Sequence, residues 1–249
     1  MNTVIKLPKA LETNKMIEIK DIKKVYGGVV VVNVPQLLIQ KGESVGLVGN
    51  NGAGKTTLFR MMLDLIRPDA GEVLSKNAIV AGGEHWKNYT ASYLDEGFLI
   101  DYLTPEEYFY FIGGLSHQSR PQVDEFLLGL TEFFNGEILK KGKYIRDLSK
   151  GNQSKVGVVS CLLQNPELLM LDEPFANIDP STQFRLKSIL KDINKNKAVT
   201  TLISSHDLNH ITDVCDRILL MEKGLIIKDI ATSSSTLSEL EEYFGVGQL

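Results

Sequence analysis

The sequence contains the stretch Gly49-Asn50-Asn51-Gly52-Ala53-Gly54-Lys55-Thr56, which is followed directly by Thr57. This spacing is typical of a loop that binds the phosphates of a nucleotide. Glycines let the chain bend so that several backbone N–H groups converge on one anion. Lys55 supplies a positive charge for the β- and γ-phosphates, and Thr56 offers a hydroxyl ligand to Mg²⁺. We therefore expect residues 50–57 to bind a nucleoside triphosphate.

The segments on both sides of this loop favour the same interpretation. Residues 44–48 form a short apolar run that predicts a strand, and apolar residues recur at helical spacing from residue 55 to 66. The pair Arg67-Pro68 then ends the helical pattern. A helix that begins near Lys55 adds about half a positive charge to the anion site.

A second motif supplies acids for the metal and for chemistry. Four apolar residues at 168–171 predict a buried strand, and Asp172 and Glu173 follow it. Ligands of open parallel sheets bind at the carboxyl ends of the strands. We expect Asp172 to hold Mg²⁺ through water and Glu173 to act as a general base. An Asp-Glu pair alone would indicate only a solvated loop, so this interpretation depends on the phosphate loop.

Short apolar strands alternate with helices in the last third of the chain, which indicates an α/β fold. Such alternation implies a mostly parallel sheet that is covered on both faces. Residues 95–165 have a helical pattern, with a capping box at Thr104-Pro105-Glu106-Glu107, and predict an inserted helical subdomain. The predicted organisation is an N-terminal leader at 1–15, a main domain at 16–235, and a C-terminal helix or tail at 236–249.

Composition excludes several classes of protein. The 249 residues are 43% hydrophobic and 23% charged, which is ordinary for a globular protein and excludes disorder. A net charge of -4 argues against a protein that works mainly on nucleic-acid phosphates. We expect no membrane span and no secretory signal. Cys161 and Cys215 are expected to be reduced, buried thiols of a cytoplasmic protein.

From about residue 16 to 230, the order of motifs resembles that of the ATP-binding cassette (ABC) ATPases, and specifically the nucleotide-binding subunit of an ABC transporter. The segment Leu148-Ser149-Lys150-Gly151-Asn152-Gln153 is similar to the signature motif of that family. The resemblance implies a P-loop NTPase core with a mostly parallel sheet, an antiparallel β subdomain and an inserted helical subdomain. It also implies contacts to ATP from Ser149, Lys150, Gly151 and Asn152.

Further positions acquire a role only through this resemblance. Tyr26 matches the aromatic residue that stacks on adenine, Asp179 lies in the segment that resembles the D-loop, and His206 matches the switch histidine. Glu96 stands where the family has the Q-loop glutamine, and we expect a metal or coupling role for its carboxylate. Lys150 replaces a signature glycine, and either direct contact with nucleotide or simple solvation is open for it.

The resemblance implies an ATPase that uses ATP and Mg²⁺ and works as a head-to-tail dimer, either of this chain or with a sibling cassette. Each site would be completed by Ser149 and Gly151 of the facing subunit. Such a subunit powers transport, here expected to be export, through separate multi-spanning permease subunits at the inner face of the cell membrane. Contact with them is expected near residues 96–104.

Three alternatives stand beside this interpretation. One is a non-transport ABC ATPase that acts on a ribosome or an assembly scaffold. A GTPase would need N-K-x-D, and residues 194–197 lack the Asp. A zinc site would use His206 and His210 at i, i+4, but Asp207 replaces the Glu of H-E-x-x-H.

Overall fold

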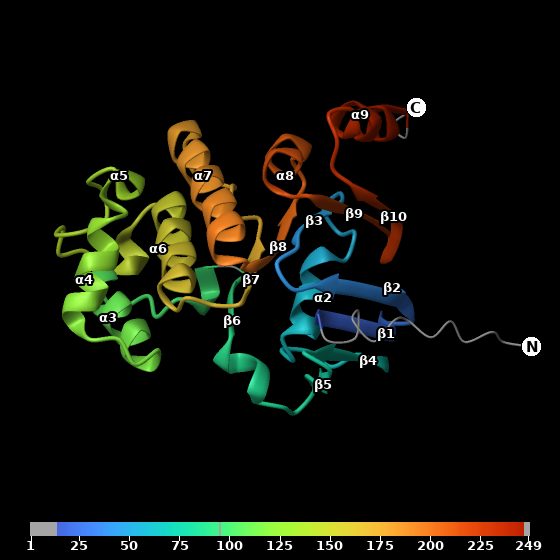
Figure 1. The fold of residues 1–249 in the computed structure, drawn as a ribbon, viewed down its shortest axis with the longest axis horizontal. Helices are drawn as coiled ribbons and strands as arrows, with labels where there is room; N and C mark the ends of the chain where they lie inside the picture. Colours follow the sequence, from blue (N-terminus) through green and yellow to red (C-terminus); the bar gives the residue numbers. More distant parts are fainter. Residues whose placement is uncertain (1–13, 95, 247–249) are drawn as a thin grey trace, which may run out of the picture.

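The computed structural model describes residues 14–94 and 96–246 (Figure 1). The strands are β1 (Lys15–Tyr26), β2 (Val29–Gln40), β3 (Ser44–Val48), β4 (Ala70–Ser75), β5 (Ala78–Ile79), β6 (Thr90–Tyr93), β7 (Leu168–Asp172), β8 (Thr200–Ser205), β9 (Arg217–Glu222) and β10 (Leu225–Ala231). The α-helices are α2 (Lys55–Met62), α3 (Pro105–Leu115), α4 (Arg120–Leu128), α5 (Thr131–Phe134), α6 (Lys150–Leu163), α7 (Pro180–Lys197), α8 (Leu208–Val214) and α9 (Thr236–Val246). Short 3-10 helices are η1 (His85–Asn88), η2 (Glu96–Phe98) and η3 (Ile145–Asp147).

The larger sheet has the strand order β10-β9-β3-β8-β7-β6. Strands β9, β3, β8, β7 and β6 pair in parallel, and β10 pairs antiparallel with β9. The mostly parallel α/β sheet is thus confirmed. Because these strands are parallel, the segments that follow β3, β7 and β8 lie together at the carboxyl-terminal ends of the strands.

This sheet separates two hydrophobic cores. Along β7, Leu169 and Leu171 belong to the core shared with α6 and α7, whereas Leu168 and Met170 belong to the core shared with α2 and β1. Alternate residues of a strand point to opposite faces, so both faces must be covered. Full burial of one such side chain contributes about 1.5–3 kcal/mol. Both faces of β7, which carries Asp172 at its end, are therefore packed against hydrophobic side chains.

The smaller sheet is antiparallel, with the order β2-β1-β4-β5, and it forms the antiparallel β subdomain. Helix α2 lies between the two sheets and buries Leu58 and Phe59 in the core that they share. Strand β2 contains Pro35, which cannot donate to a ladder, but β2 lies at the sheet edge. Pro35 lies opposite Asp21, where φ is +50° and the pairing is interrupted.

Helices α3 to α6 lie at one end of the molecule and the antiparallel sheet lies at the other (Figure 1). The predicted capping box is present: Thr104 Oγ1 accepts from the Glu107 N–H at 3.3 Å, and the Glu107 carboxylate accepts from the Thr104 N–H at 2.9 Å. Helix α2 ends at Met62 rather than at residue 66, because Asp64 adopts φ +51°. The helical pattern over 95–165 is divided among α3, α4, α5 and α6.

Strands β9 and β10 form a hairpin that turns at Lys223-Gly224, both with positive φ, as a type I′ turn requires. The predicted leader lies almost wholly in residues 1–13, which are outside the described residues, and α9 occupies most of the predicted tail. The predicted division into leader, domain and tail stays a prediction. Across residues 14–94 and 96–246, the helices are too short or too polar to cross a bilayer.

Candidate active site

The loop between β3 and α2 requires glycine where it passes other backbone segments. A Cβ on Gly49 would lie 2.2 Å from the Met221 carbonyl oxygen on β9. Gly54 has φ +106°, and its Cβ would lie 2.6 Å from the Val31 carbonyl oxygen on β2. Backbone atoms cannot rotate away as a side chain can, so both positions exclude other residues. The exposed part of the loop consists of Asn50, Asn51 and Gly52.

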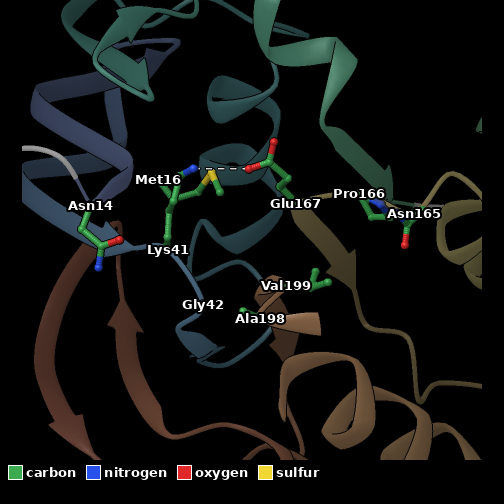
Figure 2. A pocket seen from close by; sticks show the side chains of 9 residues that line it. All are labelled: Asn14, Met16, Lys41, Gly42, Asn165, Pro166, Glu167, Ala198 and Val199. Carbon is green, nitrogen blue, oxygen red and sulfur yellow. Dashed lines mark hydrogen bonds and ion pairs between the residues drawn. The ribbon is translucent and has the colours of Figure 1, made fainter. Parts of the chain in front are cut away.

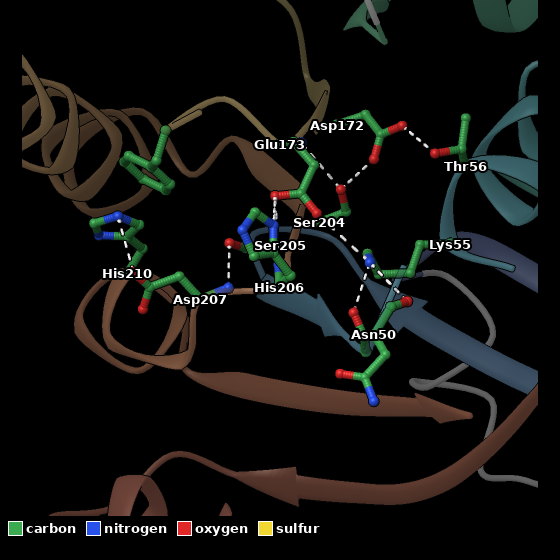
Figure 3. A network of polar contacts seen from close by, with 12 residues as sticks. Asn50, Lys55, Thr56, Asp172, Glu173, Ser204, Ser205, His206, Asp207 and His210 are labelled. Atoms are coloured by element: carbon green, nitrogen blue, oxygen red, sulfur yellow. Dashed lines mark hydrogen bonds and ion pairs between the residues drawn. The ribbon is translucent and has the colours of Figure 1, made fainter. Parts of the chain in front are cut away.

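Lys55 is the cation of this loop, and only 6% of its surface is exposed. Its Nζ donates to the Gly49 carbonyl oxygen at 2.6 Å and to the Asn50 carbonyl oxygen at 3.4 Å. It also lies 3.5 Å from Oε1 of Glu173 (Figure 3). The ammonium thus lies on the concave side of the loop, against the carbonyl oxygens of Gly49 and Asn50. This concave arrangement of a cation and a helix N-terminus fits a bound phosphate.

Asp172 ends β7 with both carboxylate oxygens engaged. The Thr56 hydroxyl donates to Oδ2 at 2.5 Å, and the Ser204 hydroxyl donates to Oδ1. Burial raises the pKa of Asp172, and these two hydrogen bonds act in the opposite direction. A carboxylate and a hydroxyl in contact at the mouth of a phosphate loop are the hard oxygen ligands that Mg²⁺ prefers. The residues present therefore fit a Mg²⁺ site, with Thr57 beside it in sequence.

Glu173 adopts φ +50°, a conformation that costs energy for any residue with a Cβ. Its Oε2 lies 2.9 Å from Nδ1 of His206 and accepts from the His206 backbone N–H at 3.3 Å. Figure 3 shows the two side chains in contact beside Lys55. A carboxylate held in this way can accept a proton from a water molecule. The structure thus brings together Lys55, Thr56, Asp172, Glu173 and His206, as the sequence predicts.

The predicted signature motif lies at the start of α6. Ser149 is the N-cap, and its hydroxyl accepts from the Asn152 N–H at 3.3 Å. Ser149 and Lys150 are exposed at this helix tip. Gly151 is buried, since a Cβ there would lie 2.2 Å from the Asn177 carbonyl oxygen. A helix N-terminus with an exposed hydroxyl can contact an anion that approaches from outside.

Asp179 is the N-cap of α7 and is bound within its own chain. Hydrogen bonds from the Ser181 hydroxyl and from Thr182 lower the pKa of Asp179. Lys155 on α6, which is only 2% exposed, places Nζ 3.8 Å from Asp179 and 3.4 Å from Glu137. The contact of Asp179 with nucleotide therefore stays a prediction. Lys155 is not predicted from the sequence, although a lysine inside an apolar helix is a signal of a buried ion pair.

Two other predicted residues lie on separate elements. Tyr26 ends β1 with half of its surface exposed, and Nζ of Lys24 lies 5.3 Å from its ring centroid. An exposed ring beside the Gly27-Gly28 turn is suitable for stacking, and this role stays a prediction. The backbone of Glu96 begins η2, but its side chain lies outside the described part of the structure.

His206 and His210 face different partners. The His210 ring packs on Phe175, with ring centroids 4.7 Å apart, and burial lowers the pKa of His210. In the described part of the chain, no three His, Cys, Asp or Glu residues converge on a metal position. These contacts contradict the zinc interpretation.

An open pocket of about 690 Å³ lies at the amino-terminal ends of the parallel strands, opposite the phosphate loop (Figure 2). Gly42, Glu167 and Val199 line it, and they precede β3, β7 and β8. Lys41 lies at its rim and places Nζ 3.3 Å from Glu167. None of the predicted site residues lines this pocket, so the pocket is separate from the phosphate site.

Comparison with known proteins identifies relatives along most of the chain. Residues 32–176 match the family described as ABC transporter. An uncharacterised ABC transporter ATP-binding protein of Nostoc sp., all4389, is 32% identical over 239 residues, which cover 92% of this chain and 68% of the relative. The methionine import ATP-binding protein MetN of Carboxydothermus hydrogenoformans is 30% identical, over 86% of this chain and 66% of its own length.

Solved structures agree with the fold. A dimeric structure of MJ0796, described as a bacterial ABC transporter cassette, has a TM-score of 0.78 at 22% identity and covers 88% of this chain and 100% of its own. The structure of an ATP binding subunit of an ABC transporter has a TM-score of 0.76 at 26% identity, with coverage of 94% and 95%. At 22% identity the first of these shows the fold alone.

Proposed function

Because this chain belongs to the ABC transporter family, as an ATP-binding subunit with ATPase activity, we propose that it powers the movement of a substrate across the cell membrane through separate membrane subunits. The observation that supports the proposal is the convergence of Lys55, Thr56, Asp172 and Glu173 at one edge of the sheet. They come from two elements far apart in sequence, yet direct contacts join them.

ATP is held by the loop and the metal ligands. The backbone N–H groups of residues 50–57 and the start of α2 bind the phosphates, and Lys55 neutralises the β- and γ-phosphates. Thr56 and Asp172 would hold Mg²⁺, which would neutralise phosphate charge. Glu96 is a further candidate ligand. Neutralisation of charge and exact placement account for most of the catalysis in phosphoryl transfer.

Glu173 is the general base of the proposed reaction. Its carboxylate takes a proton from the water that attacks the γ-phosphorus, and His206 fixes that carboxylate in place. The bond between the γ-phosphorus and the β,γ-bridging oxygen breaks, and ADP and phosphate leave. Because Lys55 also contacts Glu173, arrival of the triphosphate redirects the ammonium to phosphate oxygens. The carboxylate is then free to face the water.

A facing cassette completes each site. The start of α6 presents the exposed Ser149 hydroxyl and the backbone N–H of the buried Gly151 to the γ-phosphate held by the other subunit, with Lys150 and Asn152 beside them. Asp179 lies next to this interface, and Tyr26 stacks on the adenine of its own site. The second cassette is a copy of this chain or a sibling.

The membrane partner contacts the surface near residues 96–104. Phe98 is 52% exposed and Tyr102 is 64% exposed, and exposed aromatic side chains are typical of interfaces. Most neighbouring aromatics are core residues instead, for example Phe109, which is fully buried. We place the chain at the inner face of the cell membrane, and export is the proposed direction. One relative, by contrast, is named for methionine import.

Purification of the chain from solubilised membranes tests this proposal. We expect a multi-spanning membrane protein to co-purify, and loss of that partner when Phe98 and Tyr102 are both changed to Ser. Recovery of ribosomes or a soluble scaffold instead would support the non-transport alternative. ATP-driven accumulation of substrate in inside-out vesicles would support export, and accumulation in right-side-out vesicles would contradict it.

A further inference from the structure

Ser204 is a buried hydroxyl at the carboxyl end of β8, and its exposed fraction is 0%. In the parallel register of β7 and β8, it is the direct partner of Asp172. Burial of a hydroxyl is unfavourable unless hydrogen bonds replace its contacts with water. The partners of this hydroxyl therefore indicate why a serine occupies the position.

The hydroxyl of Ser204 contacts both acids of the site (Figure 3). It donates its single hydrogen to Oδ1 of Asp172. It also accepts from the backbone N–H of Glu173 at 3.0 Å. One side chain thus links the carboxylate that would hold the metal with the backbone of the proposed base.

Each of these contacts restricts a specific geometry. Thr56 holds the other oxygen of Asp172, so the Ser204 hydrogen bond fixes the rotation of the carboxylate plane. Glu173 has φ +50°, and a conformation of this kind persists only where surrounding groups maintain it. The Ser204 hydroxyl helps to maintain it by accepting from the Glu173 N–H, which donates also to the Ser204 carbonyl oxygen at 3.2 Å. The Glu173 side chain points toward Lys55 and His206.

We propose that Ser204 is a positioning residue of the ATPase reaction, which orients Asp172 toward the metal and Glu173 toward the attacking water. This inference rests on the proposed roles of those two acids. Ser204 lies behind both groups rather than at the substrate, so its effect should appear in turnover and in metal-dependent affinity. ATP affinity without metal depends on the Lys55 loop and should not change.

The test compares Ser204→Ala with Thr201→Val. Thr201 is a matched control because it lies on the same strand, is 1% exposed, and donates its hydroxyl to Ser44. For Ser204→Ala we expect kcat to fall tenfold or more and KM for Mg²⁺-ATP to rise about threefold or more. Thr201→Val should keep kcat within threefold of the unmodified chain.

A binding measurement provides a readout that does not depend on turnover. Affinity for trinitrophenyl-ATP is measured with Mg²⁺ and with EDTA, and the ratio of the two gives the gain due to metal. We expect Ser204→Ala to reduce this gain at least threefold without changing the affinity in EDTA. An unchanged gain, or a kcat within twofold of the unmodified chain, would overturn the inference.

Two variants separate a specific role of the Ser204 hydroxyl from a general effect on β8 or on folding. An equal fall in kcat for Thr201→Val would also overturn the inference, because the effect would then belong to the strand as a whole. If Ser204→Ala does not fold, Ser204→Cys decides the question, since a thiol is a weak donor: a tenfold fall supports the inference and an unchanged rate overturns it. Absence of Mg²⁺-dependent hydrolysis in the unmodified chain would instead refute the proposed function.

Discussion

Nζ of Lys55 lies 3.5 Å from Oε1 of Glu173, so the cation of the phosphate loop and the acid after β7 form an ion pair. The same ammonium donates to the Gly49 carbonyl oxygen at 2.6 Å. A bound triphosphate would compete with both groups for this single cation. ATP binding should therefore release Glu173 for its role as a base, and loss of the cation should affect binding first.

Lys55→Met should lower the affinity for ATP by about two orders of magnitude or more, because a charge-assisted contact to phosphate is lost from a buried site. Lys76→Met is the matched control, since Lys76 pairs with Glu167, which precedes β7 and lies at the opposite end of that strand from Asp172. Isothermal titration calorimetry with ATP measures both variants. Equal affinity in Lys55→Met and the unmodified chain would show that the loop does not hold the phosphates.

Gly151→Ala and Gly114→Ala should have opposite effects. A Cβ at Gly151 meets the Asn177 carbonyl oxygen at 2.2 Å, whereas at Gly114 in α3 it meets nothing within 4 Å. We expect Gly151→Ala to lower the free energy of unfolding by about 1–3 kcal/mol and to reduce ATP turnover. Gly114→Ala should raise it by about 0.5–1 kcal/mol. Urea denaturation measures both, and equal effects would contradict the packing at Gly151.

Asp213 should contribute to stability only above acidic pH. Hydrogen bonds and charge from Lys191 and Lys187 lower the pKa of Asp213 and join α8 to α7. Because the folded-state pKa lies below the unfolded one, the contribution is present above about pH 4 and is lost as pH falls through the folded pKa. Asp213→Asn should flatten the loss of unfolding free energy between pH 5 and 2. Identical pH profiles for the two proteins would contradict this pairing.

Cys161 and Cys215 should be unreactive in the folded protein. Both thiols are buried, and desolvation raises the pKa of each to about 12. At pH 8 the reactive thiolate is therefore almost absent. Ellman's reagent should label neither thiol in buffer and both in 6 M guanidinium chloride. Rapid labelling of the native protein would show that the core around them opens.

Strands and helices with strong local signals could be predicted closely from the sequence. The bounds of β3 and β7 agree with their apolar runs, because each strand is buried along its whole length and its neighbours in sequence end it. Strand β2 escaped prediction because Pro35 is acceptable only at a sheet edge, which depends on distant partners. The end of α2 was predicted too late because an apolar pattern does not show where Asp64 reverses the chain.

In the site, too, residues that lie in local sequence motifs could be predicted, whereas residues placed by contacts between distant segments could not. The phosphate loop and the pair Asp172-Glu173 follow from motifs in which chemistry and spacing are adjacent in sequence. Ser204 was not predicted, because its role depends on the register between β7 and β8. Lys155 was not predicted either, since its carboxylate partners come from two loops that only the fold brings to α6.

The most direct test of the central claim is the ATPase rate of Glu173→Gln, measured together with ATP affinity and oligomeric state. The substitution keeps the shape of the side chain but removes the proton acceptor. We predict that turnover falls to background, that ATP affinity is retained, and that a dimer with trapped ATP appears in size-exclusion chromatography. Hydrolysis by Glu173→Gln at a rate near that of the unmodified chain would contradict the account.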